Sequence, residues 1–271
     1  MINIKPNLIG IAGNPQVGKN TVGKIILYLI YVEQKEKEGI IPTITLKDFI
    51  EKNITSAYCD WYIKRFNNNL QKIASILTGV SIDSSDNLLG KEWKVYYVKL
   101  ESATHPIDKN TQRISRFYLS EQNVKDDWFK EKTPISNFEI ANDILTTSQF
   151  IKLLEDSIKE VHPNILVNAL FKDYQLQHGP STYLNPYPSL EYPNWIISDL
   201  KHNNEFQAIK DRGGLCIKVI NIEKYKPVTA MLAKTELSSC KFNFIIENFG
   251  TIDDLVEEVR KMLIHFKLLE K

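Results

Sequence analysis

The sequence predicts a three-layer α/β fold with a mostly parallel central sheet and helical insertions. Short apolar segments alternate with segments whose apolar residues recur at helical spacing, and this alternation is typical of parallel sheets covered by helices. The chain has 271 residues, of which 43% are hydrophobic and 25% charged, so one domain can bury a sizeable core. The sequence contains no visible internal repeat.

The first strand and the first helix are expected at the N-terminus. Residues 7–12 (NLIGIA) form a short apolar run that ends at Gly13, as a buried parallel strand does. From Val17 to about Tyr31 the apolar residues share one helical face. The charged residues 33–39 suit a solvated helix end or a loop.

The middle of the chain is predicted to hold a helix and then an insertion. Apolar residues recur at helical spacing from 62 to 77. We therefore expect the aromatic segment WYIKRF (61–66) to pack into the core as part of an amphipathic helix, and stacking on a base is the alternative. Residues 95–143 are mostly polar and weakly periodic, which predicts an insertion that can act as a lid.

The C-terminal half is expected to alternate helices and strands. The predicted helices are 148–161, ILVNALFKDY (165–174), NNEFQAIKDRGG (203–214) and a last helix after Thr251. The predicted strands are WIISD (195–199), LCIKVIN (215–221) and FNFIIEN (242–248). Thr147 or Ser148 is the expected cap of the first of these helices, and Thr251 of the last. Because residues 178–193 are rich in proline, they are predicted to be an irregular loop.

Composition excludes several classes of function. Lys plus Arg number 34 and Asp plus Glu number 33, so nothing in the charge balance calls for a nucleic-acid partner. The three cysteines and five histidines fall into no metal-binding spacing, which favours reduced thiols and an intracellular setting. The sequence shows neither a signal peptide nor a run of 18 apolar residues, so we expect a cytoplasmic protein without membrane contact.

Residues 13–21 (GNPQVGKNT) nearly match a phosphate-binding loop. Gly13 and Gly18 let the backbone wrap closely around a phosphate, Lys19 supplies a charge for the β- and γ-phosphates, and the next helix presents its positive end. The flanking strand and helix are the context that this motif requires, whereas the alternative is a glycine-rich turn with a solvent-exposed lysine. Asn20 stands where Ser or Thr is expected, so Thr21 is the predicted hydroxyl ligand of Mg²⁺.

These features predict a P-loop NTPase-type fold. The candidate cofactor-binding residues are Gly13, Asn14, Gly18, Lys19, Asn20 and Thr21, for ATP with Mg²⁺.

Five segments, in this order, resemble the phage-type deoxynucleoside monophosphate kinases, which are P-loop kinases that phosphorylate dNMPs with ATP. The segments are GKNT (18–21), LQKIASILTGVSIDSSDN (70–87), TTSQFIKLLEDSIKEVHPNILVNALFKDY (146–174), WIISDLKHNNEFQAIKDRGGLCIKV (195–219) and KTELSSCKFNFIIENFGTIDDLVEEV (234–259). Members of this family commonly end the loop in Gly-Lys-Asp-Thr, so Asn20 occupies the aspartate position. The resemblance implies a single P-loop kinase domain that acts on small nucleotides, and a homodimer is compatible with it.

The chain also departs from the family pattern. Lys201 and Lys159 stand where the family has arginines, and Gln149 and Gln71 stand where it has an arginine and a basic residue. Residues 231–234 (MLAK) replace a histidine-x-serine-glutamate segment. Lysine cannot form the paired hydrogen bonds that arginine forms to phosphate, and these departures concern the proposed acceptor site. The sequence therefore supports the ATP-binding donor site better than the acceptor site.

Lys19, Asp199 and Lys201 are the predicted catalytic residues. Asp199 lies at the carboxyl end of a predicted strand, where open α/β sheets bind ligands. It is expected either to hold a water or another group that binds the metal, or to act as a base near the acceptor, or else to cap the following helix. Lys201 either contacts the acceptor phosphate or is a plain surface lysine. An arginine of the insertion, Arg113 or Arg116, is a further candidate for the transferred phosphate.

Four other residues are predicted to bind substrate. Arg65 and Lys72 flank the helix that resembles the acceptor side of the family. Asp156 and Lys159 share a helical face at i, i+3, which permits either a nucleotide contact or an ordinary surface pair.

The function predicted from these residues is transfer of the γ-phosphoryl group of ATP to a (deoxy)nucleoside monophosphate. One alternative is a degenerate relative that binds nucleotide without transfer, which the departures at Gln71, Gln149 and residues 231–234 favour. Another is a P-loop kinase for a different small acceptor. Base and sugar preference depend on the shape of the acceptor pocket, which no motif encodes.

Overall fold

The structure, a computed structural model, describes residues 6–51, 59–78, 92–100, 118–120, 138–178, 190–221 and 236–270. The chain divides into two compact units, which are described separately below. Unit 1 comprises Met1–Asn67 and Asn164–Lys271, and unit 2 comprises Asn68–Pro163. Unit 2 is therefore an insertion into the sequence of unit 1.

Unit 1 is built on a five-stranded sheet in which every ladder is parallel. The strand order is β10-β9-β1-β8-β2. The strands are β1 (Leu8–Ala12), β2 (Trp61–Lys64), β8 (Asn194–Leu200), β9 (Leu215–Ile220) and β10 (Phe244–Glu247). All five residues of β1 are buried, as expected of the central strand of a sheet that is covered on both faces.

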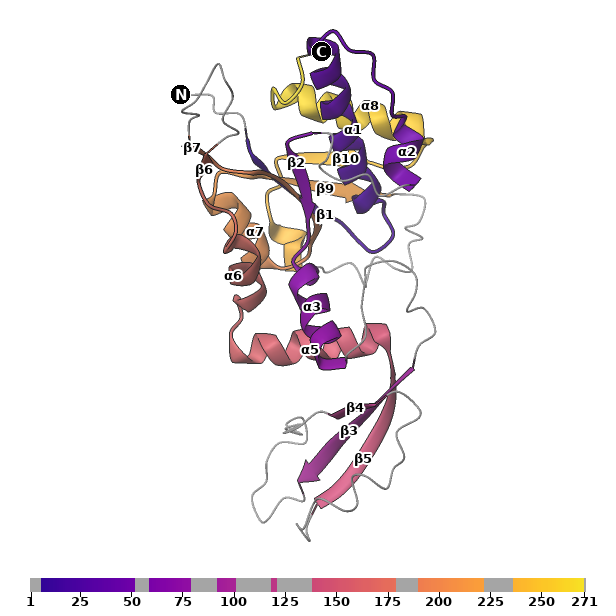
Figure 1. The fold of residues 1–271 in the computed structure, drawn as a ribbon, viewed down its shortest axis with the longest axis vertical. Helices are drawn as coiled ribbons and strands as arrows, with labels where there is room; N and C mark the ends of the chain where they lie inside the picture. The colour runs from indigo at the N-terminus through magenta and orange to yellow at the C-terminus, as the bar shows by residue number, and fades with distance from the viewer. Residues whose placement is uncertain are drawn as a thin grey trace. The chain divides into compact units, whose positions relative to one another are not determined.

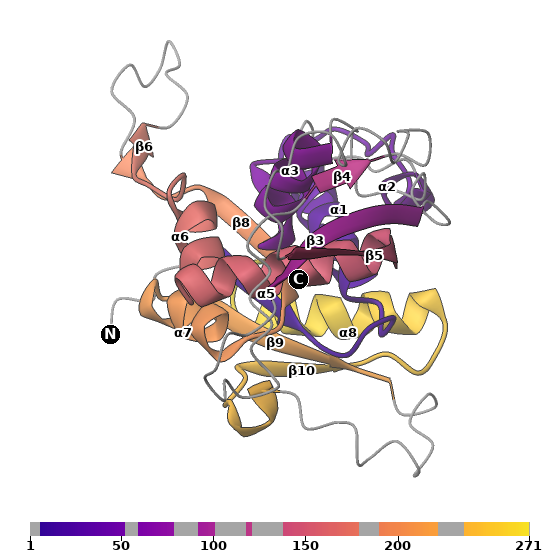
Figure 2. The same ribbon diagram turned by 90° about the horizontal axis from the view of Figure 1, so that it is seen from below.

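Helices cover both faces of this sheet. Alternate residues of β1 serve the two faces: Ile9 and Ile11 belong to one buried cluster, and Leu8 and Ala12 to the other. Figure 1 shows α1 (Lys19–Lys37) and α8 (Ile252–His265) on one side, with α6 (Ile165–Phe171) and α7 (Asn203–Asp211) on the other. Figure 2 shows α8 running alongside β10, against which it packs. The predicted three-layer α/β fold is confirmed.

Two short elements of unit 1 had no counterpart in the sequence analysis. Helix α2 (Leu46–Glu51) packs on α1 through Phe49, whose ring lies 5.6 Å from that of Tyr28 and 5.5 Å from that of Tyr31. The 3₁₀ turn η2 (Glu236–Ser239) contacts α7. Helix α1 also extends through most of the charged segment 33–39, so that segment is a helix end rather than a loop.

The prediction of a single helix over residues 62–77 was wrong in its first residues. Residues 61–64 form β2, a parallel edge strand paired with β8, and the helix α3 (Asn67–Thr78) begins only after it. The exposure alternates along the first residues of β2, since Trp61 is buried and Tyr62 is exposed. Aromatic residues fit such a half-buried pleated surface, and that preference prevailed over the helical spacing.

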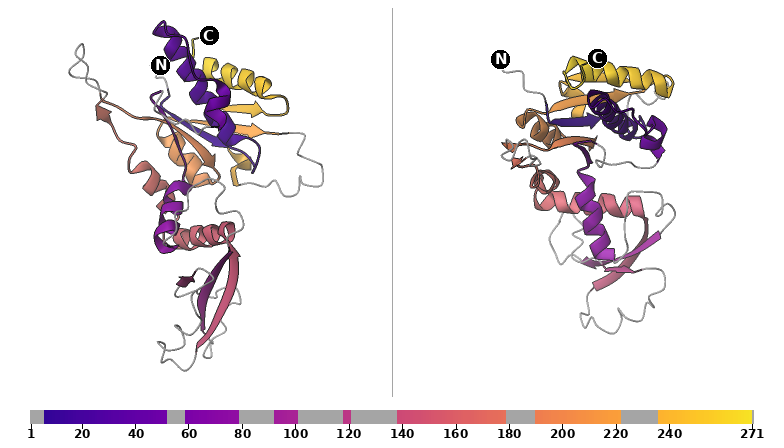
Figure 3. Two further views of the ribbon diagram at one scale, coloured as in Figure 1. Left: turned by 45° about the vertical axis from the view of Figure 1, so that its right-hand side comes forward. Right: turned by 45° about the horizontal axis from the view of Figure 1, so that its top comes forward.

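Unit 2 contains an antiparallel sheet that the sequence analysis did not anticipate. Its strands are β3 (Glu92–Leu100), β4 (Tyr118–Ser120) and β5 (Phe138–Thr146), in the order β4-β3-β5. Figure 3 shows β5 leading into α5 (Thr147–Val161), which matches the predicted helix 148–161. Residues 101–117 and 121–137 of the predicted insertion, with Arg113 and Arg116, lie outside the described residues. Its action as a lid stays a prediction.

The predicted irregular loop 178–193 is described only at its ends. Its described ends pair as two short antiparallel strands, β6 (Gln177–His178) and β7 (Leu190–Glu191). Next to them the rings of Tyr174 and Tyr192 stack at 5.1 Å. Residues 179–189 lie outside the described part of the chain. None of the helices in the described ranges has the length and apolar character needed to cross a lipid bilayer.

The cap of α8 gives a test of this fold. Thr251 Oγ accepts a hydrogen bond from the backbone N–H of Asp254 at 3.3 Å, and Asp254 accepts one from the backbone N–H of Thr251 at 2.7 Å. Thr251→Ala removes the first bond, so it should lower the free energy of unfolding by about 1 kcal/mol. Urea denaturation followed by circular dichroism measures this loss. Ser238→Ala, at an exposed position of η2, is the control, and equal values for the two variants would contradict the capping role.

Candidate functional site

Strand β1 ends in a loop whose backbone requires glycine at two positions. Gly13 has φ 151° and Gly18 has φ 94°. A Cβ on Gly13 would lie 2.5 Å from the backbone oxygen of Val219 on the neighbouring strand β9. The loop therefore turns in close contact with β9 and delivers the chain into α1, which starts at Lys19.

Lys19 folds back over this loop. Its Nζ donates to the backbone oxygens of Gly13 and Asn14, both at 2.7 Å. Burial lowers the pKa of the Lys19 ammonium, the nearby Lys201 lowers it further, and Asp199 partly opposes both effects. Its acceptors among the described residues are thus two neutral carbonyls, and an anionic group would be a stronger partner for the ammonium.

The next two residues lie in the first turn of α1. Asn20 is exposed and Thr21 is partly buried. In the described ranges no group of three or more His, Cys, Asp or Glu side chains is placed to hold a metal ion. The magnesium site stays a prediction: in nucleotide sites Mg²⁺ commonly takes one or two protein oxygens and completes its shell with water and phosphate. Thr21 can supply one such oxygen.

Asn248 holds the loop from the opposite side. It follows β10, and its Nδ2 donates to the backbone oxygen of Val17 at 2.8 Å. A Cβ on Gly18 would come within 2.7 Å of this nitrogen, so Gly18 leaves room for the amide. The sequence analysis placed Asn248 at the end of the predicted strand 242–248 and did not identify it as a loop contact. Its position directly after the last strand of the sheet was the available signal.

Asp199, at the end of β8, is partly buried and fully engaged in hydrogen bonds. Its two carboxylate oxygens accept from the backbone N–H groups of Phe66 and Asn67, at 2.9 and 3.0 Å. Asp199 therefore caps the start of α3, and the expectation that it caps the following helix was wrong. Burial raises the pKa of its carboxyl, whereas these two bonds and the cations Lys201 and Arg65 lower it.

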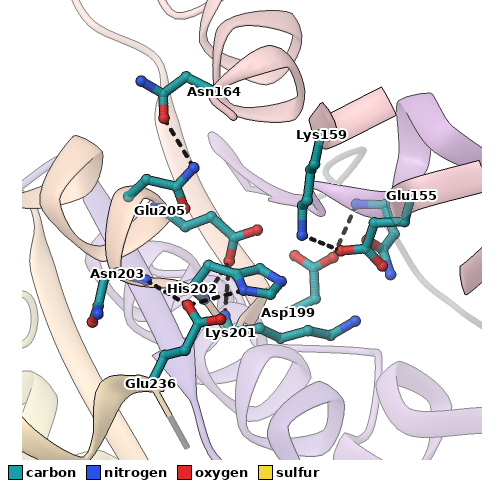
Figure 4. A network of polar contacts seen from close by, with 11 residues as sticks. Glu155, Lys159, Asn164, Asp199, Lys201, His202, Asn203, Glu205 and Glu236 are labelled. Carbon is teal, nitrogen blue, oxygen red and sulfur yellow. Dashed lines mark hydrogen bonds and ion pairs between the residues drawn. The ribbon is translucent and has the colours of Figure 1, made fainter. Parts of the chain in front are cut away.

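The following helix, α7, is capped instead by its own Glu205. Figure 4 shows this buried carboxylate, whose Oε2 accepts from the backbone N–H groups of Lys201 at 2.8 Å and His202 at 3.0 Å. Beside it, His202 Nδ1 lies 3.1 Å from Oε2 of Glu236. The two hydrogen bonds accepted by Glu205 fix the backbone between Asp199 and α7. They therefore also fix the position of the Lys201 backbone, from which its side chain extends.

The loop lines a cavity of about 150 Å³. Its lining brings together the predicted residues Gly13, Asn14, Lys19 and Lys201. It also includes Lys218 of β9, which the sequence analysis did not single out. A lysine within an otherwise buried strand was the signal that could have identified it. The lining residues that the structure describes include three lysines and no acidic residue, a charge balance that suits an anion.

The predicted substrate-binding residues fall in both units. In unit 1, Arg65 Nε donates to Ser198 Oγ at 3.3 Å, one residue before Asp199. In unit 2, Lys72 and Asp156 are exposed, and Lys159 forms an ion pair with Glu155 at 2.5 Å rather than with Asp156. Their contacts with nucleotide stay predictions.

Of the positions that depart from the family pattern, Gln149 is exposed and Gln71 is partly buried. Residues 231–234 lie outside the described residues. The three cysteines, Cys59, Cys216 and Cys240, all carry free thiols.

Glu205 gives the site a pH dependence. Burial raises the pKa of this carboxyl to about 7, against an ordinary value of 4.5. Between those values the folded chain keeps a proton that the unfolded chain has released. The associated stabilisation is complete below pH 4.5 and is lost as the pH rises through 7. Urea unfolding from pH 4.5 to 8 should show a smaller loss for Glu205→Gln than for the wild type, and parallel curves would contradict the assignment.

The capping role of Asp199 can be tested in the same way. Asp199→Asn leaves one of two backbone donors facing an amide NH₂, so the free energy of unfolding should fall by about 1–3 kcal/mol. Asp173→Asn, at an exposed position, is the matched control. A value equal to that of the control would show that the carboxylate does not stabilise the start of α3.

Comparison with known proteins agrees with this architecture. A profile of the deoxynucleotide monophosphate kinase family matches residues 7–259, which include the loop, Asp199 and Lys201. No curated protein matches the chain closely enough to count as a relative. The parallel sheet, the loop between β1 and α1 and the matched span together show a P-loop kinase-type fold, and the chain belongs to the deoxynucleotide monophosphate kinase family.

Proposed function

We propose that this protein transfers the γ-phosphoryl group of ATP to a (deoxy)nucleoside monophosphate, giving the diphosphate and ADP. Family membership supports the class of reaction. The observation that carries the proposal is the cavity in which the glycine turn, Lys19 and Lys201 meet without an acidic neighbour in its lining. Phosphoryl transfer needs positioning and cations for the charge on the moving group, and this cavity offers both.

On the donor side, the loop would bind the phosphates of ATP through its backbone N–H groups. Lys19 would exchange its two carbonyl acceptors for phosphate oxygens, which are the stronger partners for an ammonium group. When bound, Mg²⁺ neutralises negative charge on the phosphates, and Thr21 is the residue that would hold it.

On the acceptor side, Lys201 would contact the transferred or accepting phosphate, because its side chain lines the same cavity as Lys19. Asp199 already holds two backbone N–H groups, so we assign it mainly a positioning role beside Lys201. Arg65, Lys72, Asp156 and Lys159 remain the proposed binding residues for the nucleoside monophosphate. The reaction requires no nucleic-acid or membrane partner.

A second candidate is nucleotide binding without transfer. It is favoured by the ion pair between Lys159 and Glu155, because Lys159 is a proposed ligand of the acceptor phosphate and is already paired with a carboxylate. The glutamines at positions 71 and 149 also favour binding without transfer, because they replace basic residues that the family pattern places at the acceptor site.

ADP release from Mg-ATP, scanned over the common dNMPs and NMPs, tests the proposal. The wild type should release ADP only with an acceptor. Lys19→Ala should lower this rate about a hundredfold or more, because it removes a cation aimed at the phosphates. Lys261→Ala, which removes an exposed lysine from α8, should leave the rate unchanged. ATP binding without ADP release for any acceptor would overturn the proposal and leave the second candidate.

A further inference from the structure

Lys218 occupies an unusual place for a lysine. It lies in β9, with β1 on one side and β10 on the other, and its ladder partners are Ala12 and Ile245. Its neighbours along the strand, Ile217 and Val219, are buried. Placing a cation in the interior of a parallel sheet costs free energy unless a hydrogen-bonding or charged partner, from the protein or from a ligand, compensates for the lost hydration.

Within the described part of the chain, Lys218 has no hydrogen-bond acceptor and no carboxylate partner. Its ammonium lies 5.6 Å from the centroid of the Phe242 ring. Such a contact is weaker than a charged hydrogen bond to an anion. By contrast, Lys24 donates to the backbone oxygen of Ile50 at 2.6 Å, and Lys210 donates to a side-chain amide at 3.0 Å.

The side chain of Lys218 lines the same cavity as Lys19 and Lys201. The described lining residues include three lysines and no acidic residue, and Asp199, outside this lining, is a carboxylate whose charge acts on Lys19 and Lys201. Ala12, the ladder partner of Lys218, is the last residue before the loop, so the register alone places this lysine beside the turn. Its strand, β9, lies on one side of β1, and β8, which leads to Lys201, lies on the other.

We infer that Lys218 is a third cation of the phosphate site and binds an oxygen of the donor triphosphate beside Lys19. The inference rests on the proposed function for the identity of the ligand. Phe242 holds the ammonium when no anion is bound, and the phosphate oxygen replaces the ring in the complex. Lys201 and Lys218 then approach the triphosphate from the two strands that flank β1.

The experiment compares Lys218→Met and Lys218→Arg with Lys241→Met in the full-length protein. Methionine keeps an unbranched apolar side chain of nearly the same length and removes the ammonium group. Lys241 is exposed, precedes Phe242 in the chain and does not line the cavity, so Lys241→Met is matched in charge and location. Calorimetry measures the Kd for Mg-ATP and for inorganic tripolyphosphate, and circular dichroism checks the fold.

Lys218→Met should raise both Kd values about ten- to a hundredfold, as expected for loss of a charged hydrogen bond. Lys218→Arg should restore most of the affinity, and Lys241→Met should leave it unchanged. Equal affinities for Lys218→Met and Lys241→Met would overturn the inference, as would failure of the wild type to bind tripolyphosphate. If Lys218→Met does not fold, Lys218→Gln takes its place with the same expected loss.

The acceptor-dependent release of ADP separates this inference from the proposed function. Binding that depends on Lys218, together with no ADP release for any acceptor, would support the phosphate contact and reject the kinase reaction. ADP release that is normal in Lys218→Met, with unchanged Kd values, would support the kinase and reject the contact.

Discussion

The burial of β1 is the constraint on which the rest of the site depends. Its five residues lie between β8 and β9 and are covered on both faces, so the strand has one register and one direction. The loop begins where β1 ends, and its first glycine touches the backbone of β9. Because the neighbouring strands are parallel, their carboxyl ends meet at the same edge. Lys201 and Lys218 line the cavity beside the loop for this reason, although they are far from it in sequence.

The acidic and basic residues at this edge have different tasks. Asp199 and Glu205 each accept two backbone N–H groups, and these bonds shape the chain at the starts of α3 and α7. Among the described residues, Lys19 and Lys218 have carbonyl or aromatic contacts, and Asp199 is a carboxylate whose charge acts on Lys19 and Lys201. The two carboxylates thus bind backbone N–H groups, while Lys19, Lys201 and Lys218 line the cavity. At Lys201, lysine in place of the arginine expected from the family pattern gives the cation more conformational freedom and less geometric selectivity toward phosphate.

Much of unit 1 could be predicted from sequence because its signals are local. The apolar runs at β1, β8 and β9, the glycine after α7 and the cap at Thr251 each depend on neighbouring residues. The edge strand β2 was misread because aromatic residues at 61–66 satisfy both a helical and an extended pattern. Lys218 and Asn248 gain their meaning from contacts with residues about 200 positions away or more, through the register of β9 and the bond to Val17. Asp199 was placed correctly near a strand end, but its partners are the first residue of α3 and the residue before it, which no local pattern connects to Asp199.

The order of the strands also has a consequence for how the chain folds during synthesis. The loop and the first strand leave the ribosome early, whereas the two strands that flank them end at residues 200 and 220, and Asn248 follows later still. The whole of unit 2 is made in between. The N-terminal segment, with its exposed apolar strand, must therefore wait for most of the chain before it can be enclosed. A nascent chain stalled before residue 190 lacks both neighbours of β1, so it holds the phosphate-binding motif in its sequence without the sheet that gives the motif its shape.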